Sequence, residues 1–215
     1  PYFKGRNFLM KGAEMAEEYF VGQALVWPER EVSSVLRPEY DKGEGAFELA
    51  APIYARVSDK SELIRKQYLD MNMWLPGDIL LKADKMCMAH SLELRVPFLD
   101  RRVMEFAEHI PDRYRVNENG NKLVLRHAAN KSLPDEWATR PKVGFPVPMI
   151  YWLREEKWYN WVKEYFTAPW ASEFFDCDVL MGLLDGHYEG KAQNQRKIYT
   201  PLVFLIWYKR YFIDE

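Results

Sequence analysis

The sequence predicts a mainly α fold, and three observations support this prediction. Apolar residues recur at helical spacing in several stretches of the 215 residues. Serine or aspartate stands directly before some of these stretches, where the first turn of a helix needs a capping side chain. No stretch alternates apolar and polar residues cleanly enough to indicate a strand. We expect residues 1–215 to form a single helical unit, although this length also allows two small domains.

The amino-terminal quarter is expected to contain two helical stretches and a loop. Residues 13–27 carry apolar side chains at helical spacing, and Pro28 is expected to end that helix. Residues 29–36 offer one or two further turns. Residues 38–52 hold two glycines and several charged side chains, so we expect a loop or linker there.

Two helices are expected in the next part of the chain. Residues 58–61 (SDKS) are placed to cap a helix over residues 62–74. Residues 75–78 (LPGD) are expected to break the chain, with Asp78 capping the second helix. We expect His90 to be a satisfied core histidine rather than a catalytic one, because one face of this helix carries the side chains of Ile79, Ala83, Met86 and His90.

Prolines separate the elements that follow. Val96-Pro97 favours an extended or turn conformation, and Asp100 is expected to cap a helix through Phe106. Residues 119–121 (NGN) predict a turn before a helix over residues 122–131, which Leu133-Pro134 ends.

The last third contains a loop followed by two or three helices. Residues 140–148 (RPKVGFPVP) hold three prolines and a glycine, which predict a structured loop without helix or strand. The last helix is expected to begin near Thr200, with Pro201 at its first position.

Composition excludes several classes of protein. The net charge of -2 gives no sign of a nucleic-acid partner. The longest apolar run, residues 201–208, is far shorter than the roughly 20 residues that span a membrane. The amino-terminal residues have no continuous apolar core, and Cys87 and Cys177 form no CxxC motif, so we expect a cytoplasmic protein.

The chain begins at Pro1 in the middle of a pattern, which suggests a piece of a longer protein.

Common nucleotide and metal motifs are missing from the sequence. The nearest approach to a phosphate-binding loop is residues 186–192 (GHYEGKA). Its glycine spacing is one residue short, and Ala192 replaces the hydroxyl that should reach Mg²⁺. We therefore expect a surface turn there. The sequence has no HExxH motif and no histidine cluster, so no metal site is expected.

Two segments stand out, residues 82–100 and residues 140–148. In the first, Glu93 and Arg95 precede Val96-Pro97. They are expected to pair locally, or with neighbours, to satisfy a helix end rather than to serve a functional site. In the second, Lys142 stands on a loop stiffened by proline, which suits either a binding lysine or a solvated connector. The residue types alone leave both interpretations of each segment open.

Longer motifs that include these segments, and a third motif between them, resemble a known family, the glutamine-hydrolysing asparagine synthetases. The resemblance to their synthetase domain rests on KADKMCMAHSLELRVPFLDRRVMEFA (82–107), KLVLRHAA (122–129) and LPDEWATRPKVGFPVP (133–148), in that order. Residues 196–208 resemble the terminal helix of that domain, and residues 3–27 resemble the helical stretch that follows its ATP site. The resemblance therefore covers essentially the whole chain.

The resemblance implies a fold and a reaction. The fold is the helical carboxy-terminal portion of an adenine-nucleotide α-hydrolase-like synthetase domain, the PP-loop ATP pyrophosphatase type. Such ligases activate aspartate with Mg-ATP to β-aspartyl-AMP and pyrophosphate. Ammonia from a separate glutaminase domain then gives asparagine and AMP. Since the family's SGGxDS loop and glutaminase cysteine are absent from this sequence, we expect the chain alone to be inactive and to bind no cofactor.

The same resemblance implies roles for individual residues. Lys142 matches the family lysine that contacts the ATP phosphates, where a positive charge would stabilise the departing pyrophosphate. Arg140 and Gly144 are expected to shape the loop that carries Lys142. Four further residues are expected to build or line the floor of the synthetase site: Lys82, Asp84, Glu93 and Arg95.

Other functions remain open at this stage. Related synthetases that form β-lactams or cyclise peptides share the adenylation step. A non-catalytic helical interaction module is the other alternative, with a docking surface of Trp158, Trp161, Tyr165, Phe166 and Trp170.

For the ligase we expect aspartate, ATP and ammonia or glutamine as substrates, and the missing amino-terminal domains as partners. An exposed apolar face is expected to promote a homo-oligomer, without nucleic acid or membrane partners.

Overall fold

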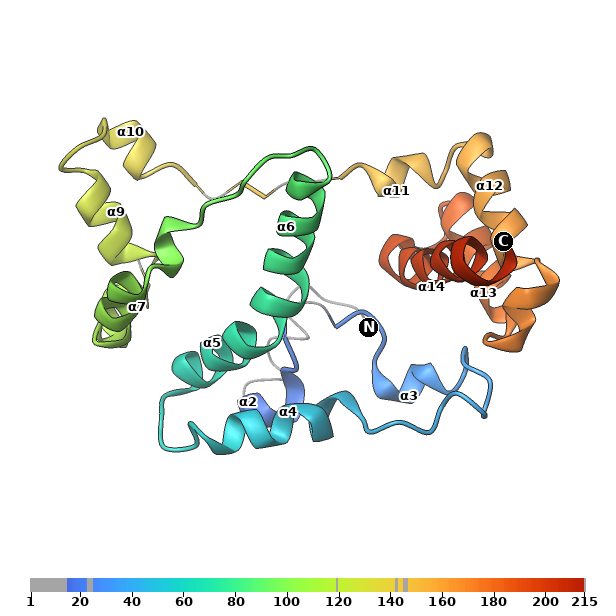
Figure 1. The fold of residues 1–215 in the computed structure, drawn as a ribbon, viewed down its shortest axis with the longest axis horizontal. Coiled ribbons are helices and arrows are strands. Elements are labelled where there is room, and N and C mark those ends of the chain that lie inside the picture. Colours follow the sequence, from blue (N-terminus) through green and yellow to red (C-terminus); the bar gives the residue numbers. More distant parts are fainter. Residues whose placement is uncertain (1–14, 23–24, 119, 142, 145–146, 215) are drawn as a thin grey trace. The chain divides into compact units, whose positions relative to one another are not determined.

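The computed structural model separates the chain into two compact units (Figure 1). Unit 1 comprises Pro1–Gln23 and Ala50–Gly144, and unit 2 comprises Ala24–Leu49 and Phe145–Glu215. The structure describes residues 15–22, 25–118, 120–141, 143–144 and 147–214. Residues 13–14 and 23–24 of the helix predicted over residues 13–27 lie outside the described residues.

Unit 1 consists of short helical segments and one small antiparallel hairpin. Its strands pair Val116 with Asn121 and Asn117 with Gly120. The elements are α2 (Ala16–Tyr19), the second half of α4 (Ala46–Ala55), α5 (Glu62–Asn72), η1 (Leu75–Leu80), α6 (Leu81–Met88), η2 (Pro97–Leu99), α7 (Arg101–Glu108), α8 (Asp112–Arg115), β1 (Val116–Asn117), β2 (Gly120–Asn121), α9 (Leu123–Ala129) and α10 (Asp135–Ala138).

The core of unit 1 is small and is formed by α2, α4 and α5. Its buried members are Ala16, Ala50, Tyr54 and Leu69. The Tyr54 hydroxyl donates a hydrogen bond to the Phe20 carbonyl at 2.7 Å. Burial raises the pKa of Tyr54 to about 12, so the phenol keeps the proton that it donates.

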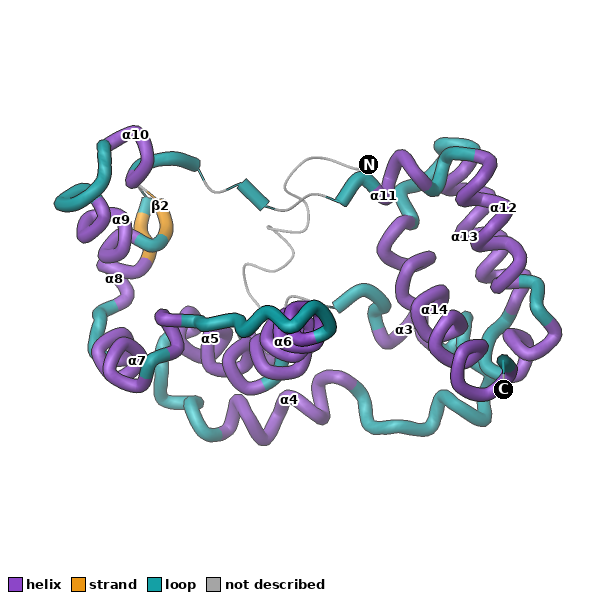
Figure 2. The backbone as a smooth tube through the Cα atoms, turned by 45° about the horizontal axis from the view of Figure 1, so that its top comes forward, coloured by secondary structure: helices purple, strands orange, loops and turns teal. Residues whose placement is uncertain are grey.

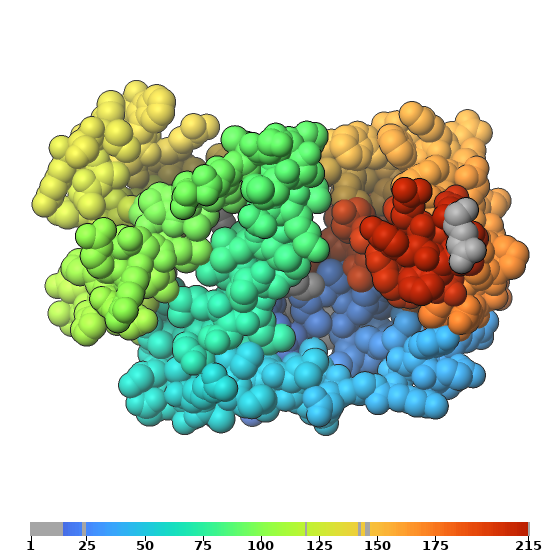
Figure 3. Space-filling model, viewed as in Figure 1, coloured from blue at the N-terminus to red at the C-terminus, as the bar shows by residue number. Residues whose placement is uncertain are grey.

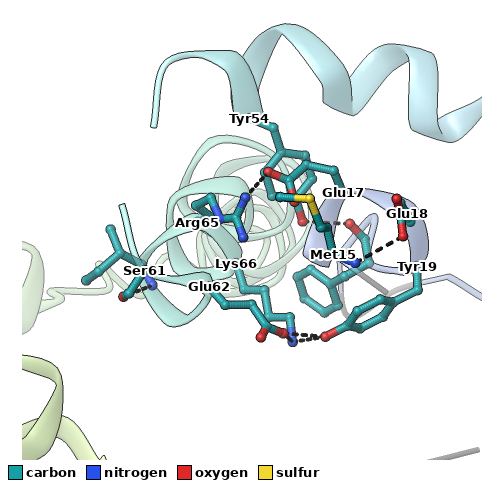
Figure 4. Close-up of polar contacts among 11 residues, drawn as sticks. Met15, Glu17, Glu18, Tyr19, Tyr54, Ser61, Glu62, Arg65 and Lys66 are labelled. Carbon is teal, nitrogen blue, oxygen red and sulfur yellow. Dashed lines mark hydrogen bonds and ion pairs between the residues drawn. The ribbon is translucent and has the colours of Figure 1, made fainter. Parts of the chain in front are cut away.

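Polar side chains add to the contact between α2 and α5 (Figure 4). Arg65 pairs with Glu17, and its residue surface is only 8% exposed. Lys66 donates to the Glu62 carboxylate and to the Tyr19 hydroxyl. Removing a charge from water is costly, so Arg65 and Glu17 have to stay paired where they are buried. The contact between α2 and α5 is therefore polar as well as apolar.

Two predicted helix caps in unit 1 are confirmed, whereas the predicted break between α5 and α6 is wrong. The Ser61 hydroxyl accepts from the Ile64 amide at 3.4 Å, and the Asp100 carboxylate accepts from the Arg102 amide at 3.0 Å. Residues 75–80 form the π-helical turn η1, which continues into α6. Its Pro76 lies at the start of the turn, where a missing N–H costs little.

Asp78 consequently does not cap α6. Its carboxylate instead accepts a hydrogen bond from the Trp74 indole at 2.9 Å, one turn earlier. This contact satisfies the side chain within a continuous helical stretch, so the proline and glycine around it do not separate two helices.

The amino-terminal part of the chain is less helical than predicted, and the loop is shorter. The helix predicted over residues 13–27 is described only as the four residues of α2, and Gly22 then takes a φ of +105°. That value suits glycine. The helix itself ends at Tyr19, because Phe20 is already extended, with φ −120° and ψ 110°. In the predicted loop over residues 38–52, only the part before α4 is irregular. Alanine favours the helix of α4, where burial of Ala50 and Tyr54 offsets the proline inside it.

Unit 2 is formed mainly by three longer helices, which lie together in Figures 1 and 2. A small antiparallel bridge between Leu36 and Phe175 ties the earlier part of the unit to its later part. The elements are α3 (Glu29–Val32), the first half of α4, α11 (Met149–Trp152), α12 (Glu156–Phe166), η3 (Pro169–Glu173), α13 (Cys177–Tyr188), α14 (Gln195–Tyr208) and η4 (Lys209–Ile213).

The core of unit 2 is larger than that of unit 1 and is built from apolar side chains on α12, α13 and α14. It also includes Val35, on the turn after α3, and Leu153, which follows α11. Its buried members are Val35, Leu153, Val162, Phe166, Ala171, Phe175, Leu180, Leu184, Ile198, Leu202 and Leu205. None of the described helices is long and apolar enough to cross a lipid bilayer.

The predicted start of the last helix is wrong. Helix α14 begins at Gln195 instead of Thr200, and Pro201 lies inside it. Proline removes one helical hydrogen bond. However, Pro201 is buried on the same face as Leu202 and Leu205, which pack into the core. Burial of this face compensates for the missing bond.

The buried histidine of the described chain is His187, and the prediction for His90 is wrong. His90 follows α6 and is exposed. His187 has no exposed surface, and its Nε2 lies 3.1 Å from the Ile150 carbonyl. The Asn194 amide donates to Nδ1 at 3.1 Å. Since a carbonyl only accepts and an amide only donates, the ring is neutral with its proton on Nε2.

We expect the stability of unit 2 to fall as the pH drops below about 6.5. Burial lowers the pKa of His187 from its ordinary value of 6.5. The unfolded chain therefore takes up a proton at a higher pH than the folded chain does. The stability is present above the unfolded pKa and is lost as the pH falls through the lower folded pKa.

Urea unfolding at about pH 7.5 and about pH 5.5 tests this expectation. His187→Gln removes the titrating ring. The variant is expected to be less stable at the higher pH, because its buried partners lose hydrogen bonds, but to depend less on pH. An equal loss of stability in both proteins at low pH would place the titration elsewhere.

Candidate functional site

The predicted site residues that the structure describes all belong to unit 1. Lys82 and Asp84 lie on α6, where both side chains are exposed. The Lys82 ammonium is 3.8 Å from the Asp78 carboxylate, one helical turn away. Asp84 forms no ion pair with any other described residue. Both groups are therefore accessible to a ligand.

Helix α6 ends in a hydrogen-bonded turn that redirects the chain. The Leu92 amide donates to the Cys87 carbonyl and the Ser91 amide to the Met88 carbonyl, both at 3.0 Å. Ser91 has a φ of +57°, in the left-handed region where this turn usually places glycine. An L residue there costs about 1 kcal/mol. The turn fixes the direction in which the following residues leave the helix.

Glu93 and Arg95 follow this turn and form the predicted local ion pair. Their charged groups are 2.6 Å apart, and their side chains are 69% and 82% exposed. Water screens such a pair, so it contributes little to stability. The segment from α6 to α7, green in Figure 3, lies on the surface of unit 1. Both charges are consequently available to a partner or ligand.

The loop over residues 140–148 contains neither helix nor strand among its described residues, as predicted. Lys142, the predicted catalytic residue, lies outside the described residues. Arg140 has an exposed side chain. A Cβ added to Gly144 would meet no atom within 4 Å, so packing within this chain does not require glycine there.

The structure does not join the two predicted segments directly. No hydrogen bond or ion pair is found between residues 82–96 and the described part of the 140–148 loop. The loop is instead held by Arg126 on α9, whose guanidinium donates to the Arg140 carbonyl at 2.8 Å. Sequence reasoning did not single out this arginine. It belongs to the KLVLRHAA motif, but the motif does not indicate which carbonyls it reaches.

The surface around the candidate site is apolar in many places. Between Leu69 and Ala138, no described residue is buried. Amphipathic helices normally cover such a face with another element. The exposed apolar side chains include Met86, Met88, Leu92, Phe98, Phe106 and Trp137.

Two competing sites receive less support. Among the residues that the structure describes, no group of histidine, cysteine or acidic side chains is arranged to hold a metal. Residues 186–192 contain the end of α13 and a turn, with Gly190 at a φ of +75°. A helix rather than a strand precedes this turn, so the prediction of a plain turn is confirmed.

The predicted aromatic docking surface is only partly a surface. Phe166 has no exposed area and belongs to the core, so its assignment to a docking surface is wrong. Trp161 packs edge-to-face against Trp158 at 5.9 Å and against Tyr165 at 5.2 Å, measured between ring centroids. Tyr165 in turn contacts Trp170 at 6.2 Å. These rings contact one another across the surface of unit 2.

Comparisons with known proteins agree with the motifs. The family model described as Asparagine synthase matches residues 6–209. The chain is 36% identical to "Asparagine synthetase [glutamine-hydrolyzing] 1" of Bacillus subtilis (strain 168), over 99% of this chain and 34% of that protein. It is 34% identical to a putative asparagine synthetase of Mycobacterium bovis, over 95% of this chain and 31% of that protein.

A more distant similarity reaches an animal protein. The asparagine synthetase of Homo sapiens is 34% identical over 57% of this chain and 22% of that protein. The chain spans about a third of the length of the first two relatives. No solved structure matches it.

Proposed function

The chain belongs to the asparagine synthase family, and from this membership we propose that it forms part of an ATP-dependent ligase that converts aspartate to asparagine. The observation that carries the proposal is the match over residues 6–209, which includes both predicted segments. Since the chain spans about a third of its relatives, the active enzyme would be a longer, cytoplasmic protein that contains this chain.

The proposed reaction has two steps. The aspartate side-chain carboxylate attacks the α-phosphorus of ATP, and the bond to the departing pyrophosphate breaks to leave β-aspartyl-AMP. Ammonia released from glutamine then attacks the acyl carbon, and AMP leaves with the electrons of the broken bond. A proton lost from the nitrogen gives neutral asparagine. Negative charge accumulates on pyrophosphate in the first step, so a positioned cation accelerates that step.

Residues of this chain would supply positive charge to the synthetase site and would form its floor. Lys142 would contact the phosphates, and the 140–148 loop that carries it would be shaped by Arg140 and Gly144. The longer protein would use ATP with Mg²⁺, and we propose no residue of this chain as a ligand of the metal. The site floor would include Lys82, Asp84, Glu93 and Arg95.

The remaining part of the longer protein would complete the site. Exposed apolar side chains surround the candidate residues, and nothing is buried between Leu69 and Ala138 among the described residues. A second element packed on this face would bury those side chains and gain free energy from removing them from water. The incomplete packing supports the proposal that the chain alone is inactive.

Aspartate-dependent release of pyrophosphate from ATP tests the proposed function. The full-length protein is expected to release pyrophosphate and to form asparagine with glutamine or ammonia, whereas the 215-residue chain alone is expected to do neither. A full-length protein that is silent with aspartate and ammonia would contradict the substrate assignment. Activity of the chain alone would contradict the need for the remaining domains.

A further inference from the structure

Arg126 connects three segments of unit 1 through one guanidinium group. Its Nε donates to the Asn121 carbonyl at 3.1 Å, beside the hairpin. Its Nη1 donates to the Ala138 carbonyl at 3.0 Å and to the Arg140 carbonyl at 2.8 Å. One side chain on α9 therefore joins the hairpin, the end of α10 and the first residue of the 140–148 loop.

The chemistry of this contact requires arginine. A guanidinium is a rigid planar fork with five N–H donors, so it can hold several carbonyls in one fixed arrangement. Arg126 forms no ion pair among the described residues, and its charge is directed to backbone oxygens. Ala138 is 6% exposed, the lowest value among described residues between Leu69 and Gly144. The contact thus anchors the loop to the best-packed point of this region.

The anchored carbonyl lies directly before Pro141, two residues ahead of Lys142 in the sequence. Pro141 follows Arg140, and a proline ring fixes its own φ near about −65°. The residue before a proline is also restricted to extended conformations. These two restrictions narrow the conformations of Arg140 and Pro141, so anchoring the Arg140 carbonyl limits how the loop can start.

We propose that Arg126 is a positioning residue for the synthetase reaction, which holds the start of the loop so that Lys142 can reach the phosphates. This inference rests on the proposed function. Arg126 acts through the backbone of residues 138–140 and contacts no substrate. Its loss would release the Arg140 carbonyl from this anchor while Lys142 stays in the sequence.

Arg115 provides a matched control in the same unit. Its guanidinium also donates to backbone carbonyls, those of Ile110, Ala107 and Glu108, and to the Gln67 side chain. These bonds close the end of α7 and do not touch the 140–148 loop. Arg126→Met and Arg115→Met both remove a guanidinium and keep a flexible apolar stem.

The first test measures pyrophosphate release by the full-length protein at a temperature well below unfolding. Arg126→Met is expected to lower kcat about 10- to 100-fold, because a displacement of about 1 Å costs about that much. Arg115→Met is expected to keep the wild-type kcat per folded molecule. Arg126→Lys, which keeps the charge but loses the fork, is expected to recover only part of the rate. An unchanged kcat in Arg126→Met, in an enzyme that is active as wild type, would overturn the proposal.

The second test does not depend on activity. Trypsin cleavage of the Lys142–Val143 bond, followed by mass spectrometry, is expected to be several-fold faster in Arg126→Met than in wild type or Arg115→Met. Equal cleavage rates would overturn the anchoring role. If the wild-type enzyme releases no pyrophosphate but cleavage accelerates as expected, the proposed function fails while the loop anchor stands.

Discussion

Lys142→Ala is expected to slow aspartate-dependent pyrophosphate release about 100- to 1,000-fold in the full-length protein. Its proposed role rests on the RPKVGFPVP motif (140–148), whose resemblance to the family implies a phosphate-contacting lysine. The ammonium would balance the negative charge that develops as pyrophosphate leaves. A neutral methyl group offers neither charge nor hydrogen bond, so the transition state loses that stabilisation.

The control for this variant is Lys191→Ala. Lys191 lies in residues 186–192 (GHYEGKA), the nearest approach to a phosphate-binding loop in the sequence. It is exposed and pairs with Glu189 at 2.6 Å. Its loss is expected to leave the rate unchanged, because that segment forms a plain turn. A rate unaffected by Lys142→Ala would contradict the assignment of this lysine. A rate lowered by Lys191→Ala instead would transfer the phosphate contact to residues 186–192.

Phe166→Ala is expected to lower the free energy of unfolding of unit 2 by about 3–5 kcal/mol. Phe166 is the last residue of α12 and has no exposed surface. It belongs to the cluster that contains Leu184 of α13 and Leu205 of α14. Removing the ring loses its burial and leaves a cavity between helices that cannot close it fully.

Urea unfolding of the 215-residue chain, followed by tryptophan fluorescence, measures this change. Phe106→Ala serves as the control, since Phe106 is 66% exposed on α7. That substitution is expected to change the free energy by less than about 0.5 kcal/mol. A midpoint for Phe166→Ala close to the wild-type value, at an unchanged slope, would mean that the three helices do not share this core.

Local signals predicted several elements of the fold correctly. Ser61 and Asp100 cap their helices because each oxygen reaches an amide only two or three residues away. The 140–148 loop is irregular where it is described, because three prolines close together remove the amide donors that a helix or a sheet needs. In these places the deciding interaction lies within a few residues along the chain, so the sequence contains it.

Predictions failed where distant contacts outweighed local preference. Proline was expected to start the last helix, yet α14 accommodates Pro201 within it because that face is buried against the rest of the core. Likewise, α4 forms across a predicted loop, with Ala50 and Tyr54 buried in unit 1. Burial of one helical face outweighs the local cost of a proline when the partner helices are present.

The sequence by itself determined the mainly helical class, the family and the candidate residues, because long motifs and short-range capping are written along the chain. Only the tertiary structure decided that His187 rather than His90 is buried, that Phe166 is core rather than surface, and that Arg126 holds the Arg140 carbonyl. The physical reason is that burial and hydrogen-bond partners depend on which segments meet in space. Helical spacing places a side chain on a face, but it does not say what that face contacts.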